Sequence, residues 1–477
     1  MASWHSLWNI KEEMKMFASP DIPKGSLRYA VILTLVFIVI PVSLDLYGQS
    51  HTGQAPQKGY EERIRVFVDS LRVCDTHEHL LNPAIIKGAS SFDFTLLFLE
   101  NSKNDLLGAG MPGTLFVDIF NSSMSPEEKW EKIEPYWNNT FNTASNRVIL
   151  IALNNLYGIN DLNRNSVGPL SQKMRTANQT DWFDHVLREI CKIDYVIQDG
   201  DPIKTKDNCI RNVNRFTAWI TLDSKKTIDS LAIMQIKPIY KLEDLVENLK
   251  NAFLTSIDDG MVAIKIDLAY TRTLDFENVT PEAAGKVFKT LVNGNSDYTL
   301  HEKEAKTLQD YLIHQLLSLA QQNNIPVAFH TGVQAGHYNS NINNANPVLL
   351  TNLFKQYPNL KFALFHGSYP FGGELSTLAK NFKNVYIDMN WTYSISPAYA
   401  ERYLEEWLET VPVSKIMAFG GDQRLIENTY GNLVIAKKVI SDVLIRKVGE
   451  KYLSEPEAKK IAKMLLYDNG KKFYNIH

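Results

Sequence analysis

Cysteine is scarce in this chain of 477 residues, which contains only three. Cys74, Cys191 and Cys209 are too widely spaced to form the paired cysteines of a structural zinc site. In an exported protein Cys191 and Cys209 could form a disulfide, and otherwise they would be two buried free thiols. The sequence leaves that choice open, but it excludes a zinc site built from cysteine pairs.

A strong charge of one sign, internal repeats and low-complexity segments are also missing. The net charge is −3, and acidic and basic residues are spread along the chain. Without a basic stripe, nucleic acid is not an expected partner. We expect a small-molecule substrate, and membrane contact only through the N-terminal apolar segment. Assembly into a homo-oligomer stays open.

Long hydrophobic runs are limited to one, at residues 29–44. This run is short for a relaxed membrane span but long enough for the core of a signal peptide. Lys15, Lys24 and Arg28 precede it, which favours a cytoplasmic N-terminus. We expect residues 1–58 to be a signal peptide or a transmembrane anchor plus a linker, with a buried core helix as the alternative. Residues 59–477 would then lie outside the cytoplasm, periplasmic or membrane-anchored.

Short β-rich segments alternate with helical patterns in the second half of the chain. The predicted strands are 216–222, 261–270, 326–332, 361–367, 384–390 and 415–422, and helical patterns such as 302–324 and 398–411 lie between them. Earlier strands are predicted at 72–80 and 194–200, and residues 146–153 could be a strand or the start of a helix. Such alternation predicts parallel βαβ units. We therefore expect an α/β fold, a (β/α)₈ TIM barrel in which a helical insertion at roughly residues 81–190 follows strand 1.

Polar residues recur where these predicted strands end. They are His77, His79, Lys265, Asp267, His330, His366, Asp388, Asn390 and Asp422. In a TIM barrel the carboxyl ends of the strands meet at the face that carries the active site. Strand alternation places Ile264 and Ile266 toward the helices and Lys265 inside the barrel. By the same rule His77 and His79 share one face with Asp75, and Cys74 falls on the other.

Two imidazoles two residues apart on one strand can share a metal ion. We interpret His77, His79, His330 and Asp422 as ligands of one divalent ion, with Zn²⁺ favoured and Mn²⁺ or Fe²⁺ as alternatives. An ion with an open position would lower the pKa of a water, and Asp422 would accept its proton. His366 would polarise a substrate oxygen or protonate a leaving group. Taken singly, a strand-end histidine could instead bond to a backbone carbonyl, and Asp422 could cap a helix.

This set of residues resembles the signature of the amidohydrolase superfamily, from about residue 60 to the end of the chain. HxH follows the first strand, a lysine lies near the fourth, histidines follow the fifth and sixth, and an aspartate follows the eighth. The context is most similar to the amidohydrolase-related (amidohydrolase 2) branch, and "NLYGINDL" at 155–162 is similar to its uronate-isomerase-like relatives.

The resemblance implies an enzyme that hydrolyses a C–N or C–O bond of a small polar substrate with a metal-activated water. In this interpretation Asp422 and His366 are catalytic. Uronate-type isomerisation or decarboxylation at the same site is the alternative. A binding protein with a vestigial barrel is a third interpretation, but every expected ligand position holds a competent residue.

Lys265 and the substrate-binding residues carry open alternatives. In two-metal members of this family a carboxylated lysine bridges the ions, so Lys265 could be that bridge or an inner ammonium that contacts substrate. Arg272 and Arg424 could each hold a substrate carboxylate or form a salt bridge that ties down a loop. His337, Asn390 and Trp391 are further candidates for contacts with substrate.

Overall fold

The computed structural model describes residues 59–87, 92–99, 101–205, 207–235, 238–295, 297–335 and 341–477. The apolar run at 29–44 and His337 lie outside these ranges. Within them, no helix combines the length and the apolar character needed to cross a membrane. The cysteines Cys74, Cys191 and Cys209 are buried free thiols, so the second alternative for Cys191 and Cys209 holds in this structure.

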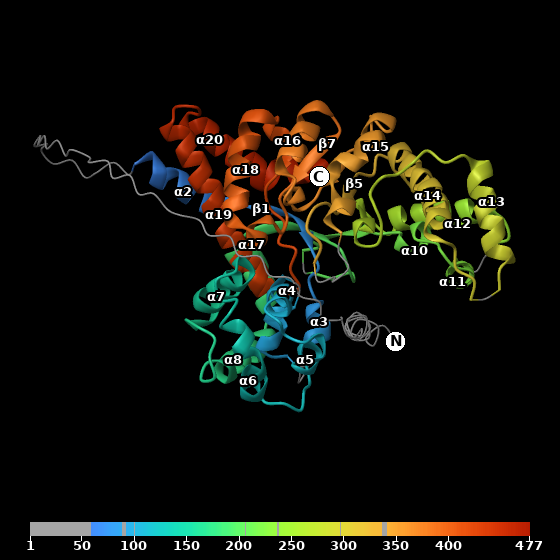
Figure 1. Cartoon of the computed structure of the whole chain (residues 1–477). Coiled ribbons are helices and arrows are strands. Elements are labelled where there is room, and N and C mark those ends of the chain that lie inside the picture. The colour runs from blue at the N-terminus through green and yellow to red at the C-terminus, as the bar shows by residue number, and fades with distance from the viewer. Residues whose placement is uncertain are drawn as a thin grey trace, which may run out of the picture.

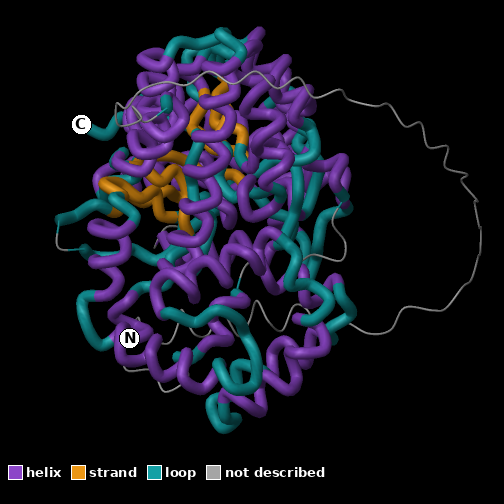
Figure 2. Tube along the Cα trace, turned by 90° about the vertical axis from the view of Figure 1, so that its left-hand side faces the viewer, coloured by secondary structure: helices purple, strands orange, loops and turns teal. Residues whose placement is uncertain are grey.

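Eight parallel strands follow one another around a single sheet in chain order (Figures 1 and 2). They are β1 (Val73–Glu78), β2 (Ile193–Gln198), β3 (Ile210–Asn214), β4 (Ala263–Ile266), β5 (Val327–Phe329), β6 (Phe362–Leu364), β7 (Val385–Asp388) and β8 (Ile416–Met417). The backbone beyond β8 pairs with β1, since the Thr76 amide donates to the Phe419 carbonyl at 3.0 Å and the Asp422 amide to the His77 carbonyl at 2.9 Å. The predicted (β/α)₈ barrel is confirmed.

Strand residues alternate between the barrel interior and the helix layer. Ile264, Ile266, Val385 and Ile387 belong to the large core between sheet and helices. The interior cluster is built from smaller side chains and the C-terminal segment; it comprises Cys74, Ile197, Ala263, Ala328, Ala363, Phe365, Met417, Phe473, Tyr474 and Ile476. Lys265 lies inside as predicted, with its ammonium 4.3 Å from the centre of the Phe365 ring. An eight-stranded barrel is just wide enough for side chains to fill it, which suits the alanines.

Strand β1 departs from regular alternation. Between Asp75 and Glu78 it advances three residues while β2 advances only two, from Val196 to Gln198. Such a bulge reverses which residues face inward. Cys74 therefore lies in the interior cluster, and the Asp75 carboxylate accepts the Gly421 amide at 3.2 Å. The prediction that Asp75 shares a face with His77 and His79 was wrong, because a period of two does not continue through a bulge.

One strand prediction was wrong, because β3 precedes the predicted strand at 216–222. Residues 146–153, for which strand and helix were both open, lie within a helix. Phe216 adopts a left-handed backbone conformation with φ 52°, and a short helix follows over Thr217–Ile220. Trp219 and Ile220 are both buried there, so the apolar run is explained by burial on a helix and not by a strand.

Helices cover the outside of the barrel. They are α2 (Tyr60–Ser70), α10 (Thr217–Ile220), α11 (Lys225–Gln235), α12 (Leu242–Asp258), α13 (Pro281–Asn293), α14 (Glu302–Gln322), α15 (Thr351–Gln356), α16 (Gly372–Asn381), α17 (Thr392–Ile395), α18 (Pro397–Thr410), α19 (Ile426–Gly449), α20 (Glu455–Lys463) and α21 (Asn469–Phe473). The patterns at 302–324 and 398–411 correspond to α14 and α18. Helix α18 begins where Ser396 caps it through the Tyr399 amide and Pro397 occupies its first turn.

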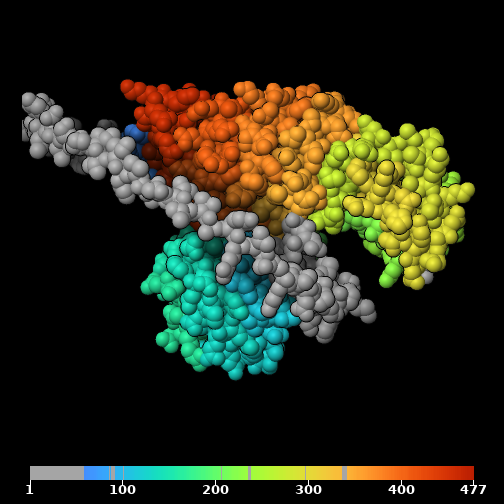
Figure 3. Space-filling view, viewed as in Figure 1, coloured from blue at the N-terminus to red at the C-terminus, as the bar shows by residue number. Residues whose placement is uncertain are grey.

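A set of helices between β1 and β2 forms a lobe beside the barrel, shown in cyan in Figures 1 and 3. It contains α3 (Pro83–Ile86), η1 (Phe94–Phe98), α4 (Asn101–Gly108), α5 (Gly113–Asp118), α6 (Pro126–Trp137), α7 (Ala144–Tyr157), α8 (Val167–Asn178), α9 (Trp182–Asp184) and η2 (His185–Ile190). Its core includes Trp130 and Trp137 together with Leu425 from the barrel. Glu427 of α19 accepts hydrogen bonds from Tyr157 at 2.6 Å and Trp182 at 3.1 Å. The lobe is thus anchored to the segment that follows β8.

A buried ion pair stabilises the inside of this lobe. Lys129, 1% exposed, lies 2.6 Å from the Asp93 carboxylate. Removing one partner leaves an uncompensated buried charge, which costs roughly 3–5 kcal/mol.

We predict that Lys129→Met lowers the free energy of unfolding by about 3–5 kcal/mol. Urea unfolding followed by circular dichroism measures the change. Adding Asp93→Asn to Lys129→Met should restore much of the loss, because the stranded carboxylate is then neutral. Equal stability of Lys129→Met and wild type would contradict a stabilising pair.

Candidate active site

Three side chains converge at the carboxyl ends of β1 and β8. His77 Nε2 and His79 Nε2 lie 3.4 and 3.3 Å from the same oxygen, Asp422 Oδ1. The three donor atoms all lie within 4.8 Å of one another. Two imidazole nitrogens and a carboxylate oxygen suit a divalent transition metal.

The state of His77 fits such an ion. This side chain is only 1% exposed, and neither of its ring nitrogens has a hydrogen-bond partner among the described residues. An unsatisfied polar group in the interior is costly. Burial, with a further contribution from the positive charge of Lys265, lowers the pKa of His77 well below its usual value. The imidazole is therefore neutral, the form that binds a metal.

His79 is oriented from behind. Its Nδ1 lies 2.6 Å from the carbonyl oxygen of Asp199, which directs Nε2 toward Asp422. Arg215 binds the Asp199 carboxylate through two hydrogen bonds of 2.8 and 2.9 Å and reaches Asp267 at 2.5 Å. Burial alone would raise the pKa of Asp199, but the positive charge of Arg215 holds it below its usual range. Sequence reasoning missed Arg215 and Asp199. The "QDG" after the predicted strand 194–200 was a signal for Asp199.

The two glycines before Asp422 are needed because the chain passes close to its neighbours. A Cβ atom on Gly420 would lie 2.5 Å from Asn390 Cβ, and one on Gly421 would lie 1.9 Å from Glu78 Oε1. Glu78 accepts the Gln423 amide at 2.6 Å. Burial, with the neighbouring Asp75, raises the pKa of Glu78 well above its usual value. The segment that carries Asp422 thus packs closely against Glu78 of β1 and against Asn390, which follows β7.

Unusual backbone conformations gather at this site. His366, Trp391 and Asp422, which follow β6, β7 and β8, have φ angles of 62°, 61° and 52°. Residues other than glycine adopt this left-handed region at a cost of roughly 1–3 kcal/mol, and they cluster at functional sites. The surrounding packing therefore supports a specific placement of these side chains.

His330 does not join the donor cluster in this structure, and its place in the ligand set stays a prediction. Its Nε2 lies 2.8 Å from the Val333 carbonyl oxygen, and its Nδ1 lies 2.8 Å from His366 Nε2. Both ring nitrogens therefore have protein partners. His366 does face the cluster, because its Nδ1 lies 3.7 Å from Asp422 Oδ2.

Three other predicted residues line the interior near these histidines. Trp391 meets the His366 ring edge-on, with 5.0 Å between ring centroids, and Asn390 is fully buried. Burial lowers the pKa of Lys265, which the nearby Asp199 opposes. Asp388 below them accepts the Thr76 hydroxyl at 2.8 Å, and burial raises the pKa of Asp388 to about 7.

The two predicted arginines differ in their surroundings. Arg272 forms a 2.5 Å ion pair with Asp310 of α14 and a 3.2 Å hydrogen bond to Gln309, which is the loop-tying alternative. Arg424 is half-buried two residues beyond Asp422, and its carbonyl accepts the Leu81 amide at 2.9 Å.

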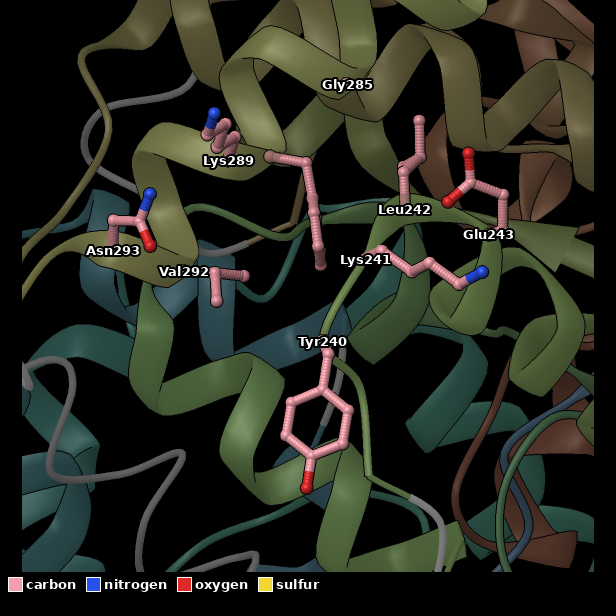
Figure 4. Close-up of a pocket in the computed structure, with 9 residues that line it drawn as sticks. Tyr240, Lys241, Leu242, Glu243, Gly285, Lys289, Val292 and Asn293 are labelled. Carbon is pink, nitrogen blue, oxygen red and sulfur yellow. The ribbon is translucent and has the colours of Figure 1, made fainter.

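A surface groove lies elsewhere, between the start of α12 and α13 (Figure 4). It is lined by Tyr240, Lys241, Leu242, Glu243, Gly285, Phe288, Lys289, Val292 and Asn293. None of the predicted site residues contributes to it, so it does not belong to the strand-end cluster.

Comparison with known families agrees with this geometry. Residues 269–475, which include His330, His366 and Asp422, match the model of the amidohydrolase family. The match covers less than half of the chain and shows a similarity to the amidohydrolase superfamily. The donor cluster of His77, His79 and Asp422 agrees with a metal-dependent enzyme of that superfamily.

Two curated relatives match part of this chain. Protein fluG from Emericella nidulans is 28% identical over 233 residues, 46% of this chain and 26% of the relative. A uronate isomerase from Mesorhizobium japonicum is 22% identical over 223 residues, 43% of this chain and 46% of the relative. The matched region thus spans less than half the length of either relative.

Solved structures extend the likeness of the fold to most of the chain. Glucuronate isomerase from Caulobacter crescentus superimposes with a TM-score of 0.70 at 18% identity, over 87% of this chain and 94% of that one. A candidate metal-dependent hydrolase from Lactobacillus casei superimposes with a TM-score of 0.60 at 18% identity, over 86% of this chain and 97% of that one. At this identity the likeness shows the shared barrel.

We predict that His77→Ala combined with His79→Ala removes most of the bound metal from the protein, because both nitrogen donors are lost. Elemental analysis of purified protein measures the content. His185→Ala is the matched control, since that histidine is exposed in the insertion and pairs with Glu189. Full metal content in the double variant would refute the donor set.

A second prediction concerns the number of metal ions. Because the Lys265 ammonium packs against the Phe365 ring, Lys265→Met should leave one metal per chain. Metal content before and after the substitution decides the matter. Two ions in the wild type, with loss in the variant and partial rescue by a small carboxylic acid, would instead identify Lys265 as a carboxylated bridge.

Proposed function

We propose that this amidohydrolase hydrolyses a C–N or C–O bond of a small polar substrate at one metal ion. The observation that supports this most directly is the position of Asp422 between two partners. Its Oδ1 faces His77 and His79, and its Oδ2 faces His366 Nδ1. A carboxylate in that position can contact an ion and pass on a proton.

His77, His79 and Asp422 would hold the ion, which when bound supplies Lewis acidity and lowers the pKa of water. Three protein ligands leave room for water or substrate. Asp422 Oδ2 accepts the proton of the attacking water, and His366 receives or returns it as the leaving group departs. Trp391, 5% exposed, packs against His366 and shields it from bulk solvent.

Uronate-type isomerisation is the second candidate, favoured by the relatives and neighbours that carry that name. A sugar acid presents a carboxylate, for which a guanidinium fork is the matching partner. Two arginines near the strand ends are engaged, since Arg272 pairs with Asp310, and Arg215 pairs with Asp199 and Asp267. Arg424, two residues beyond Asp422, stays the predicted contact for a substrate carboxylate. Because two of these three guanidinium groups already bind carboxylates of the protein, we rank hydrolysis first.

Labelled water separates the two reactions. Metal-loaded enzyme is incubated in ¹⁸O water with amides, esters and lactones, and separately with uronates. Hydrolysis places one ¹⁸O in the acid product, which mass spectrometry detects. Conversion of a uronate to its keto isomer, without turnover of any amide, ester or lactone, would replace hydrolysis with isomerisation.

We predict that Asp422→Asn retains part of the metal but lowers kcat by at least roughly 10²–10⁴-fold, since an amide cannot accept the proton. His366→Asn should keep its metal and chiefly lower kcat. Asp442→Asn is the matched control, because that carboxylate lies in the second half of α19, where it pairs with Lys438 and Arg65. Near-wild-type turnover in Asp422→Asn would rule out this mechanism.

A further inference from the structure

A chain of close polar contacts runs away from Asp422 into the barrel wall. Asp422 Oδ2 faces His366 Nδ1 at 3.7 Å, His366 Nε2 contacts His330 Nδ1 at 2.8 Å, and His330 Nε2 contacts the Val333 carbonyl oxygen at 2.8 Å. The two imidazole rings meet nearly edge-to-face, with centroids 4.4 Å apart.

The carbonyl at the end of this chain fixes where the protons lie. A carbonyl oxygen only accepts hydrogen bonds, so His330 Nε2 must carry a proton. In a neutral ring His330 Nδ1 is then an acceptor, and the contact to His366 requires a proton on His366 Nε2. The reverse arrangement would place two lone pairs against each other at Val333.

We propose that His330 is a positioning residue, which accepts the Nε2–H of His366 and thereby turns Nδ1 of His366 toward Asp422. This assigns His330 a role outside the metal shell. The proposal rests on the proposed function only in taking Asp422 and His366 as the proton-handling pair.

The surroundings of the two rings agree with this assignment. Both are almost fully buried, and burial lowers the pKa of His330 well below the usual value, so the His330 ring is neutral and its Nδ1 is free to accept the His366 proton.

Nitrogen NMR of the zinc-loaded protein tests the tautomers without any substrate. Histidines labelled with ¹⁵N are assigned by single substitutions, and the two-bond couplings show which ring nitrogen is protonated. We expect His330 to show a protonated Nε2 and an unprotonated Nδ1, and His366 to show a protonated Nε2. His314 provides the internal reference, because its Nε2 faces the Glu277 carbonyl at 3.1 Å and lies on α14.

Two substitutions of His330 separate positioning from bulk structure. His330→Asn can keep an acceptor near the place of Nδ1, so His366 should remain Nε2–H. His330→Leu removes the acceptor, so the coupling pattern of His366 should change from that of the wild type while the metal content stays at the wild-type level. If His330→Leu does not fold, the wild-type spectrum and His330→Asn still decide the matter.

Three results would overturn the proposal. They are an unprotonated Nε2 on His366 in the wild type, a doubly protonated His330, and a metal-bound nitrogen on either ring. Loss of the ion from His330→Asn would likewise show a ligand instead of a positioning residue. These measurements use no substrate, so they can refute the role of His330 whether or not the enzyme proves to be a hydrolase.

Discussion

Backbone pairing between β1 and the segment after β8 is the constraint on which the site depends. Residues 76–81 and 419–424 are about 340 positions apart in the chain, yet their amides and carbonyls bond directly. This pairing closes the barrel and brings Asp422 beside His77 and His79. Parallel strands in a closed barrel all end at one face, so the position of these donors follows from the topology.

The sequence predicted this arrangement wherever a single rule decided the structure. Strand alternation placed Lys265 inside the barrel, and strand-end polarity identified His77, His79 and Asp422, because these rules need only the pleat and the common direction of the strands. These rules gave wrong predictions where the backbone departs from a regular strand. The bulge in β1 moved Asp75 and Cys74 to the opposite faces, and the apolar run 216–222 was burying side chains on a helix.

The orientation of a side chain was beyond the reach of sequence reasoning. His330 follows β5 as expected, but its ring is turned by two contacts, with Val333 and His366, which no spacing rule encodes. Arg215 was missed because β3 was assigned too late in the chain, so the residue fell before the predicted strand and not after the real one. A polar residue is recognisable as part of a site only when the strand end that carries it is placed correctly.

The attachment of the helical lobe to Leu425 and Glu427 has a consequence for synthesis of the chain. The lobe is complete at about residue 190, but the residues that cover its inner face emerge about 240 positions later. At roughly 5–20 residues per second this is a delay of about 12–48 s. Through that interval Tyr157 and Trp182 lack their carboxylate partner and part of the lobe's core is open. Chaperone demand for this protein should therefore be greatest before the ribosome finishes the last barrel strand.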